Sequence, residues 1–137
     1  MSKIVLISCV SKKLPYRAKA MDLYTSALFR KCLQYAYSLD PTEIFILSAK
    51  HGLIKLEEEI DPYNDTLNSK PNLEIKSWAT TVISQLESKT DLGGDRFIFL
   101  AGEKYRRHLM PHIKNCEVPM RGLSIGKQLQ YLTRALT

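Results

Sequence analysis

The stretch Lys3-Ile-Val-Leu-Ile-Ser8 decides the fold class of this sequence. Its four consecutive apolar residues predict a strand that is buried on both faces, because a strand with one face in water alternates apolar and polar residues. Residues 44–47 and 97–100 have the same character. Strands buried on both faces are typical of parallel sheets that are covered by helices.

Segments with helical spacing separate these strands. Apolar positions recur at that spacing from about residue 22 to 38, and Asp40-Pro41 ends the segment, since a residue before proline disfavours the helical region. Asn72 is typical of a helix cap and precedes the apolar stripe Ile75, Trp78, Val82 and Leu86. A short helix is expected from about residue 103 to Pro111. Ser124 is expected to cap a last helix with four inward residues, Ile125, Leu129, Leu132 and Leu136.

This order of elements predicts a single three-layer α/β domain over residues 1–137, with a mostly parallel central sheet and helices on both faces. Residues 55–71 form an acidic excursion without a clear period, and residues 116–119 are expected to add a short edge strand. Ligands of such sheets bind outside the carboxyl ends of the strands. That rule selects three loops, at residues 8–13, 48–52 and 101–105.

The composition excludes several classes of protein. Among 137 residues, 45% are hydrophobic and 25% are charged, which argues against a disordered or collagen-like chain. No apolar run approaches the roughly 20 residues that span a bilayer, and the first run is too short for a signal peptide. We therefore expect no membrane partner. Three cysteines without a CxxC pair argue against a disulfide framework or zinc ribbon and favour the cytoplasm.

The charge is distributed unevenly along the chain. Residues 1–35 and 96–137 each carry a net charge of +6, while residues 36–95 carry −6. If the two basic segments converge in space, they form a surface that attracts phosphate, which favours nucleic acid or a nucleotide as partner. The alternative is a scattered, solvated surface. A homodimer is compatible with either pattern.

The loop after the first strand contains hydroxyls, a thiol and two ammonium groups, at Ser8, Cys9, Ser11, Lys12 and Lys13. These groups are suited to holding a phosphate or carboxylate. The loop has no glycine, so it is neither a dinucleotide fingerprint nor a P-loop. Cys9 is either a nucleophile whose pKa is lowered by the lysines or a small residue buried beneath the loop.

The loop after the second strand contains Ser48, Lys50, His51 and Gly52. Histidine is a residue type suited to proton transfer at neutral pH, so His51 is a candidate general acid or base, or a hydrogen-bond partner of a substrate oxygen. Gly52 can adopt a positive φ and let the backbone approach a ligand. The alternative for His51 is a purely local role, in which its ring satisfies nearby backbone groups.

The segment Ile60-Asp-Pro-Tyr-Asn-Asp-Thr66 is densely polar. Asp61 or Asp65 can position a water molecule, Tyr63 can stack on a base, and Thr66 can contact the substrate. The alternative is a turn in which Pro62 fixes φ and the polar side chains cap the backbone.

The third strand is followed directly by a helix start with cationic residues. Gly102, Glu103, Tyr105 and Arg106 are candidates for phosphate or substrate binding, and so are Ser124 and Lys127 at the last helix. His108 and His112 have the i,i+4 spacing of zinc ligands, but Pro111 disturbs the helix and no third ligand is evident. We expect neither a metal nor a cofactor.

Six motifs resemble those of a family of small bacterial and phage proteins to which no activity is assigned, and the likeness covers nearly the whole chain. They are Ser8-Cys-Val-Ser-Lys-Lys-Leu-Pro15, Asp22-Leu-Tyr-Thr-Ser-Ala-Leu-Phe29, Ile46-Leu-Ser-Ala-Lys-His-Gly-Leu53, Ile60-Asp-Pro-Tyr-Asn-Asp-Thr-Leu67, Leu100-Ala-Gly-Glu-Lys-Tyr105 and Gly122-Leu-Ser-Ile-Gly126.

Two more distant likenesses bear on function. Residues 47–52 and 61–63 resemble segments of the YaaA peroxide-stress proteins, which implies DNA binding, although Lys50-His51 replaces an apolar residue and a tyrosine. The order of elements resembles the uracil-DNA glycosylase superfamily, which implies a related fold and base release. The catalytic residue of those enzymes follows the first strand, where this sequence has no carboxylate. Asp61 or His51 is therefore the candidate for activating water.

Two functions remain open on these grounds. One is an enzyme that cleaves or exchanges the N-glycosidic bond of a nucleotide or of a base in DNA, with Asp61 and His51 catalytic, a tyrosine stacked on the base, and lysines and Arg106 on phosphates. The other is a non-catalytic binder of nucleic acid or nucleotide in stress protection or phage–host conflict. A third possibility is a protein-interaction module that uses the acidic residues 55–65.

Overall fold

The computed structural model describes residues 1–8 and 12–137. Its central sheet has five strands in the order β4-β3-β1-β6-β7. The strands are β1 (Lys3–Ser8), β3 (Glu43–Ser48), β4 (Gly52–Lys55), β6 (Arg96–Leu100) and β7 (Asn115–Glu117). All neighbours pair in parallel except β3 and β4, which are antiparallel. The predicted mostly parallel sheet is confirmed.

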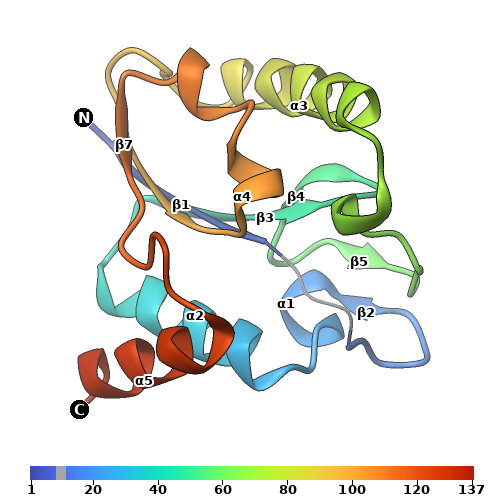
Figure 1. Cartoon of the computed structure of the whole chain (residues 1–137), viewed down its shortest axis with the longest axis vertical. Helices are drawn as coiled ribbons and strands as arrows, with labels where there is room; N and C mark the ends of the chain where they lie inside the picture. Colours follow the sequence, from blue (N-terminus) through green and yellow to red (C-terminus); the bar gives the residue numbers. More distant parts are fainter. Residues whose placement is uncertain (9–11) are drawn as a thin grey trace.

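Helices cover both faces of this sheet (Figure 1). Val5 and Ile7 of β1 face the core beneath α2 (Ala27–Ser38) and α5 (Ile125–Ala135). Ile4 and Leu6 face the opposite core beneath α3 (Asn72–Glu87) and α4 (Glu103–Arg106). All four β1 side chains are at most 2% exposed. The apolar runs are therefore explained by burial on two sides, and the molecule is a single three-layer α/β domain.

The connections on the two sides of β1 cross opposite faces of the sheet. Helix α2 leads from β1 to β3 over one face, whereas α3 leads from β4 over the other face to β6, on the far side of β1. The strand order therefore reverses between β1 and β6. In open α/β sheets, the crevice at such a reversal is where ligands bind.

The helix expected over residues 22–38 is divided in the structure. It forms α1 (Ala20–Leu23) and α2, separated by an extended segment at Tyr24. Thr25 N donates to Lys12 O at 3.0 Å, and the Ser26 side chain accepts from Phe29 N at 3.1 Å, capping α2. The hydroxyl cap and the pairing with the preceding loop compete with a continuous helix.

The helix ends otherwise follow the sequence closely. Asp40 has a φ of 52° and terminates α2 just before Pro41, as expected. Ser124 caps α5 by accepting from Lys127 N at 3.4 Å. Asn72 is the first residue of α3 rather than its cap, which is Pro71. The inward stripe predicted for the last helix is wrong at two positions, because Ile125 and Leu136 are 62% and 36% exposed.

Two strands lie where the sequence predicts none, one at the end of the loop at residues 48–52 and one within the acidic excursion at 55–71. Gly52–Lys55 forms β4, and Glu59–Ile60 forms β5, which pairs with β2 (Ala18–Lys19) in a separate two-stranded sheet. Two single-turn 3-10 helices, η1 (Leu67–Ser69) and η2 (Met110–His112), complete the structure. A hairpin was not evident in the sequence because its turn, at residues 49–51, lacks the usual short hairpin signal.

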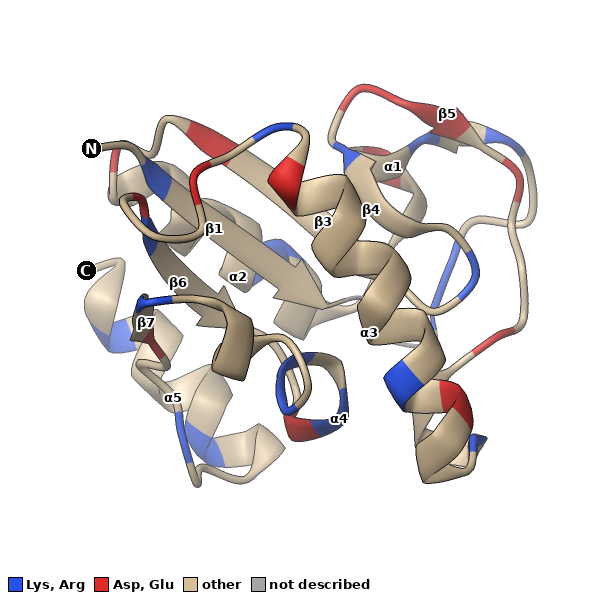
Figure 2. Cartoon of the chain, turned by 90° about the horizontal axis from the view of Figure 1, so that it is seen from above, with Lys and Arg blue, Asp and Glu red and all other residues tan. Residues whose placement is uncertain are grey.

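The two basic segments meet on one side of the molecule. Helix α5 packs on α2, and Lys31 Nζ donates to Thr133 Oγ1 at 2.7 Å between them. Figure 2 shows acidic residues, in red, along β5 and the adjoining turn. Within the described part of the chain, no helix is both long and apolar enough to cross a membrane.

Candidate functional site

The three predicted ligand loops begin level with one another at one edge of the sheet. Ser8, the last residue of β1, is paired with Leu47 of β3, and Ile7 is paired with Leu100 of β6. The parallel pairing therefore brings the carboxyl ends of β1, β3 and β6, where the three loops begin, side by side, as the sequence predicts.

A cavity of about 430 Å³ lies where the strand order reverses. We call it the switch-point cleft. Its lining comes from the ends of β1 and β6, from α2, from residues 66–68 and from the start of α5. These residues are Ser8, Leu28, Phe29, Cys32, Thr66, Asn68, Leu100, Ala101, Gly102, Tyr105, Ile125 and Gln128.

The polar rim of the switch-point cleft is held by main-chain hydrogen bonds. Gly102 N donates to Ser8 Oγ at 3.2 Å, which ties the ends of β6 and β1 together. Leu67 N donates to Tyr105 Oη at 3.2 Å, and Asn68 N donates to Thr66 Oγ1 at 3.2 Å. These bonds fix the hydroxyl oxygens in place, so the rim is formed before any ligand arrives.

The floor of the cleft is apolar. Phe29 and Cys32 of α2 are 1% and 3% exposed, and Leu100 of β6 is 3% exposed. Burial raises the pKa of the Cys32 thiol to about 12, so this cysteine is a neutral apolar surface rather than a nucleophile. An apolar floor with a few fixed polar groups at the rim is typical of small-molecule sites.

A second cavity, of about 480 Å³, adjoins the first. We call it the outer cavity. It shares Ala101, Gly102 and Gln128 with the switch-point cleft and is also lined by Glu103, Arg106 and Ser124. The Gln128 amide donates from Nε2 to Leu123 O at 2.9 Å, which holds this side chain where the two cavities meet.

Arg106 is the cation that lines the outer cavity. Its Nη1 donates to Ala101 O at 2.8 Å, so the guanidinium is held beside the end of β6. Burial and the positive charge of Arg121 lower the pKa of Arg106, and Glu103 opposes that effect. Glu103 itself lies 3.8 Å from Arg107 in an exposed ion pair.

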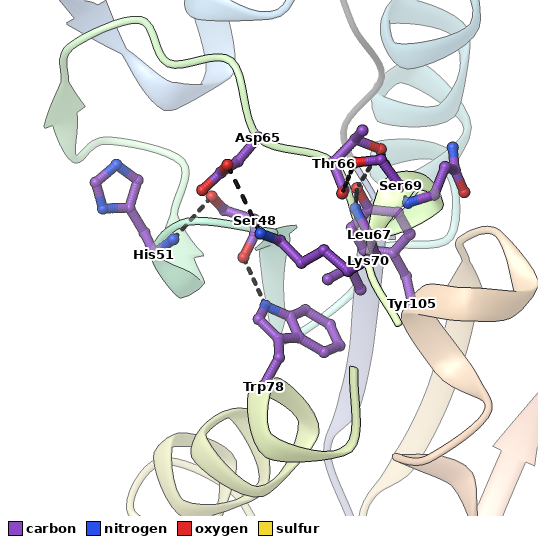
Figure 3. A network of polar contacts seen from close by, with 10 residues as sticks. Ser48, His51, Asp65, Thr66, Leu67, Ser69, Lys70, Trp78 and Tyr105 are labelled. Carbon is purple, nitrogen blue, oxygen red and sulfur yellow. Dashed lines mark hydrogen bonds and ion pairs between the residues drawn. The ribbon is translucent and has the colours of Figure 1, made fainter. Parts of the chain in front are cut away.

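A hydroxyl network lies behind the loop after β3. Ser48, which is 0% exposed, donates from Oγ to Tyr63 Oη at 2.8 Å and accepts from His51 N at 3.1 Å. Tyr63 Oη lies 2.6 Å from Tyr24 Oη. Trp78 Nε1 donates to Ser48 O at 2.8 Å (Figure 3). Four segments are thereby joined at one buried serine.

Lys13 and His51, which follow β1 and β3 in the chain, both contact the Tyr63 ring. Lys13 Nζ lies 4.5 Å from the ring centroid, and the His51 ring meets it edge-on at 5.4 Å. Tyr63 was predicted to stack on a base, and this stays a prediction. Its contacts favour a role in positioning Lys13 and His51 at the sheet edge.

Replacing Ser48 with alanine is expected to lower the free energy of unfolding by about 1–3 kcal/mol, because it removes one hydrogen-bond partner of the part-buried Tyr63 hydroxyl and the acceptor of His51 N. Chemical denaturation measures the change. Ser77→Ala on the exposed face of α3 is the matched control and should alter stability by less than about 0.5 kcal/mol. Equal effects from the two variants would contradict this role of the network.

The hydroxyl network reaches the switch-point cleft through aromatic contact. The Trp78 and Tyr105 rings meet edge-on with centroids 5.7 Å apart, and Tyr105 lines the cleft. Figure 3 shows Trp78 between Ser48 and Tyr105, with the Lys70–Asp65 ion pair above it. The loops after β3 and β6 are therefore connected through α3.

The predicted site residues fall into three groups. Seven of them line one or both of the cavities, namely Ser8, Thr66, Gly102, Glu103, Tyr105, Arg106 and Ser124. Ser48, His51, Tyr63 and Lys13 belong to the hydroxyl network or flank it. Lys12, Lys50 and Lys127 are exposed. Cys9 and Ser11 lie outside the described residues.

Asp61 and His51, predicted as the catalytic pair, are not joined by any hydrogen bond or ion pair among the residues described. Asp61 lies 3.3 Å from Arg17 in an exposed ion pair. His51 is also exposed, and its ring contacts Tyr63. Neither residue is among those that line the two cavities, so their catalytic assignment stays a prediction.

Gly52 has the predicted positive φ, of 73°. A Cβ at this position would come within 2.5 Å of Gln85 Oε1, which accepts a hydrogen bond from Leu53 N at 2.9 Å. The absence of a side chain at Gly52 therefore lets the backbone pack closely against Gln85 of helix α3.

Sequence reasoning missed Asn68 and Gln128 in the switch-point cleft. Gln128 is four residues before the fully buried Leu132, so a polar residue on the buried face of α5 was the available signal. Asn68 had no such signal, because η1 follows a segment without a regular period.

One protein family matches the chain, and its description is Family of unknown function (DUF6884), with a match over residues 4–134. The chain belongs to this family. The matched region of the DUF6884 family includes every residue that lines the two cavities and the hydroxyl network. No curated protein and no solved structure matched the chain.

Proposed function

We propose that the switch-point cleft binds a nucleotide, either free or as a unit of nucleic acid, and that the protein cleaves or exchanges its N-glycosidic bond. The observation that carries the proposal is the cleft itself, an apolar chamber with fixed polar groups at the strand-order reversal. A second cavity, with Arg106 in its lining, adjoins the cleft, and this arrangement suits a base joined to a sugar phosphate.

The lining of the cleft suits a planar base. Its floor is apolar, and residues with carboxamide side chains line it from two separate segments, at Asn68 and Gln128. Carboxamides pair with the donor and acceptor edge of a base, at about 1–3 kcal/mol for a well-formed pair. The Ser8 and Thr66 hydroxyls add further polar groups at the rim.

The reaction in this proposal is hydrolysis or exchange at the sugar. The bond between the sugar C1′ and the base nitrogen breaks, the oxygen of water or another acceptor bonds to C1′, and the base leaves with a proton. A carboxylate stabilises the positive charge that develops on the sugar. Glu103 is the carboxylate that lines the outer cavity. The likeness of element order to the uracil-DNA glycosylase superfamily supports this reaction type.

A second candidate function is nucleotide or DNA binding without catalysis, as the likeness to the YaaA proteins suggests. The observation that favours it is the position of Asp61, whose carboxylate is held by Arg17 in an exposed ion pair. The two candidates share the cleft and differ only in whether free base is released.

Binding is tested by calorimetric titration with the common nucleoside 5′-monophosphates and a short single-stranded oligonucleotide. At least one probe is expected to bind. Gln128→Met keeps the length of the side chain but removes its carboxamide, so affinity should fall about 5- to 100-fold. Gln34→Met on the exposed face of α2 is the matched control and should bind as the unaltered protein does.

Chromatography of the same mixtures detects free base. Release of base supports the enzyme, whereas binding without release supports the second candidate. If no probe binds, or if Gln128→Met binds as tightly as the unaltered protein, nucleotide binding at this cleft is wrong.

A further inference from the structure

We propose that the outer cavity is a subsite for a terminal phosphate, so that the ligand is a nucleoside 5′-monophosphate group rather than a nucleoside. This inference rests on the proposed function, since it takes the switch-point cleft as the place of the base. The outer cavity and its cationic neighbours supply the independent observations.

The first observation is how Arg106 is held. One end of its guanidinium donates to Ala101 O at 2.8 Å, while the residue lines the outer cavity. A guanidinium has five N–H donors, so several remain for a ligand after this bond is made. The bond also orients the planar group, and a planar fork of donors matches the oxygens of a phosphate.

The second observation is an excess of positive charge at this place. Arg121 precedes Gly122, which lines the outer cavity, and it is close enough to Arg106 to disfavour the charged form of that side chain. Arg121 forms no ion pair with any described residue. Two neighbouring guanidinium groups without a shared carboxylate are stabilised when an anion binds between them.

The Glu103 carboxylate does not cancel this charge. It lines the same cavity, but it is also 3.8 Å from Arg107. Across the three arginines and one glutamate, the surroundings of the outer cavity remain cationic. A phosphate dianion therefore has more to gain here than a neutral sugar.

The third observation is the connection between the two cavities. They share Ala101, Gly102 and Gln128, so one ligand can occupy both. Gly102 has no side chain to obstruct the passage, and a Cβ placed there would meet no atom within 4 Å. A base in the switch-point cleft thus places its sugar near Gly102 and its phosphate beside Arg106.

A free mononucleotide and the 5′-phosphorylated end of an oligonucleotide offer the same phosphate group. Calorimetric titrations with adenosine and its 5′-monophosphate, and with cytidine and its 5′-monophosphate, measure the contribution of the phosphate. A short oligonucleotide with and without a 5′-phosphate distinguishes the polymeric source. Inorganic phosphate is titrated alone, and its binding is detected from changes in the amide chemical shifts of the protein.

Arg121→Gln is the principal variant, because Arg121 is exposed and forms no ion pair in the described fold. It is expected to weaken binding of the monophosphate about 5-fold and to leave binding of the nucleoside unchanged. Arg134→Gln on the last turn of α5 removes one positive charge at another exposed position. It should change neither the affinity for the monophosphate nor the affinity for the nucleoside. Arg106→Lys, checked for folding by its melting temperature, should weaken the monophosphate about 10-fold.

The unaltered protein is expected to bind the monophosphate at least 10-fold more tightly than the nucleoside. Equal binding of the two, with nucleotide affinity retained, overturns the phosphate subsite and leaves the proposed function standing. Binding of inorganic phosphate that depends on Arg121, without binding of any nucleotide, supports the subsite and overturns the nucleotide function. Absence of all binding overturns both.

Discussion

Replacing Glu103 with glutamine is expected to lower the rate of base release by about 100-fold or more while nucleotide affinity changes less than about 3-fold. The carboxylate acts on charge that develops while the bond to the base is breaking, so its loss slows the reaction. Removing a negative charge from the lining of the outer cavity does not weaken binding of a phosphate there. The exposed ion pair with Arg107 contributes at most about 1 kcal/mol to stability, so the variant should fold. Single-turnover measurement of free base gives the rate.

Asp61→Asn is the comparison that decides between the two carboxylates. If the reaction depends on Glu103, Asp61→Asn should release base at a rate within about 3-fold of the unaltered protein, because Asp61 lies in an exposed ion pair with Arg17. A large loss in Asp61→Asn with none in Glu103→Gln would instead support the prediction made from the sequence. Glu87→Gln at the end of α3 controls for loss of one exposed carboxylate.

Replacing Phe97 with alanine is expected to lower the free energy of unfolding by about 3–5 kcal/mol. Phe97 is 0% exposed, lies on β6 next to the central strand, and faces the core beneath α3. The free energy of unfolding of a natural domain is only about 5–15 kcal/mol, so this substitution removes a large share of the stability of the protein. Urea denaturation monitored by circular dichroism measures the loss.

Leu73→Ala is the control for Phe97→Ala. Leu73 is 80% exposed at the start of α3, and alanine is at least as favourable in a helix, so stability should change by less than about 0.5 kcal/mol. A small loss in Phe97→Ala would mean that the core on this face of the sheet is not closely packed.

The fold could be predicted largely because its strands are buried on both faces. A continuous apolar run such as the one within Lys3–Ser8 does not suit a strand with one face in water, and the helices between the runs imply parallel pairing. The division between α1 and α2 could not be predicted in this way. It depends on the local cap that Ser26 provides to Phe29 N and on the hydrogen bond from Thr25 N to Lys12 O in the preceding loop, and neither follows from the spacing of apolar residues.

The candidate site could be predicted only in outline. The rule for carboxyl ends of parallel strands selected the edge at which the two cavities lie, because it depends on topology alone. The cleft also needs η1 and the start of α5, whose positions follow from packing in the complete fold. Asn68 and Gln128 are therefore found at the cleft only once the structure is known.

Trp78 gives the molecule an optical property that follows from its position. It is the single tryptophan of the chain, its Nε1–H is bonded to Ser48 O, and its ring meets Tyr105 at the wall of the switch-point cleft. Indole emission responds to the polarity and hydrogen bonding around the ring. Occupancy of the cleft can therefore be followed in real time from the intrinsic fluorescence of the unlabelled protein, without a dye or an added tryptophan.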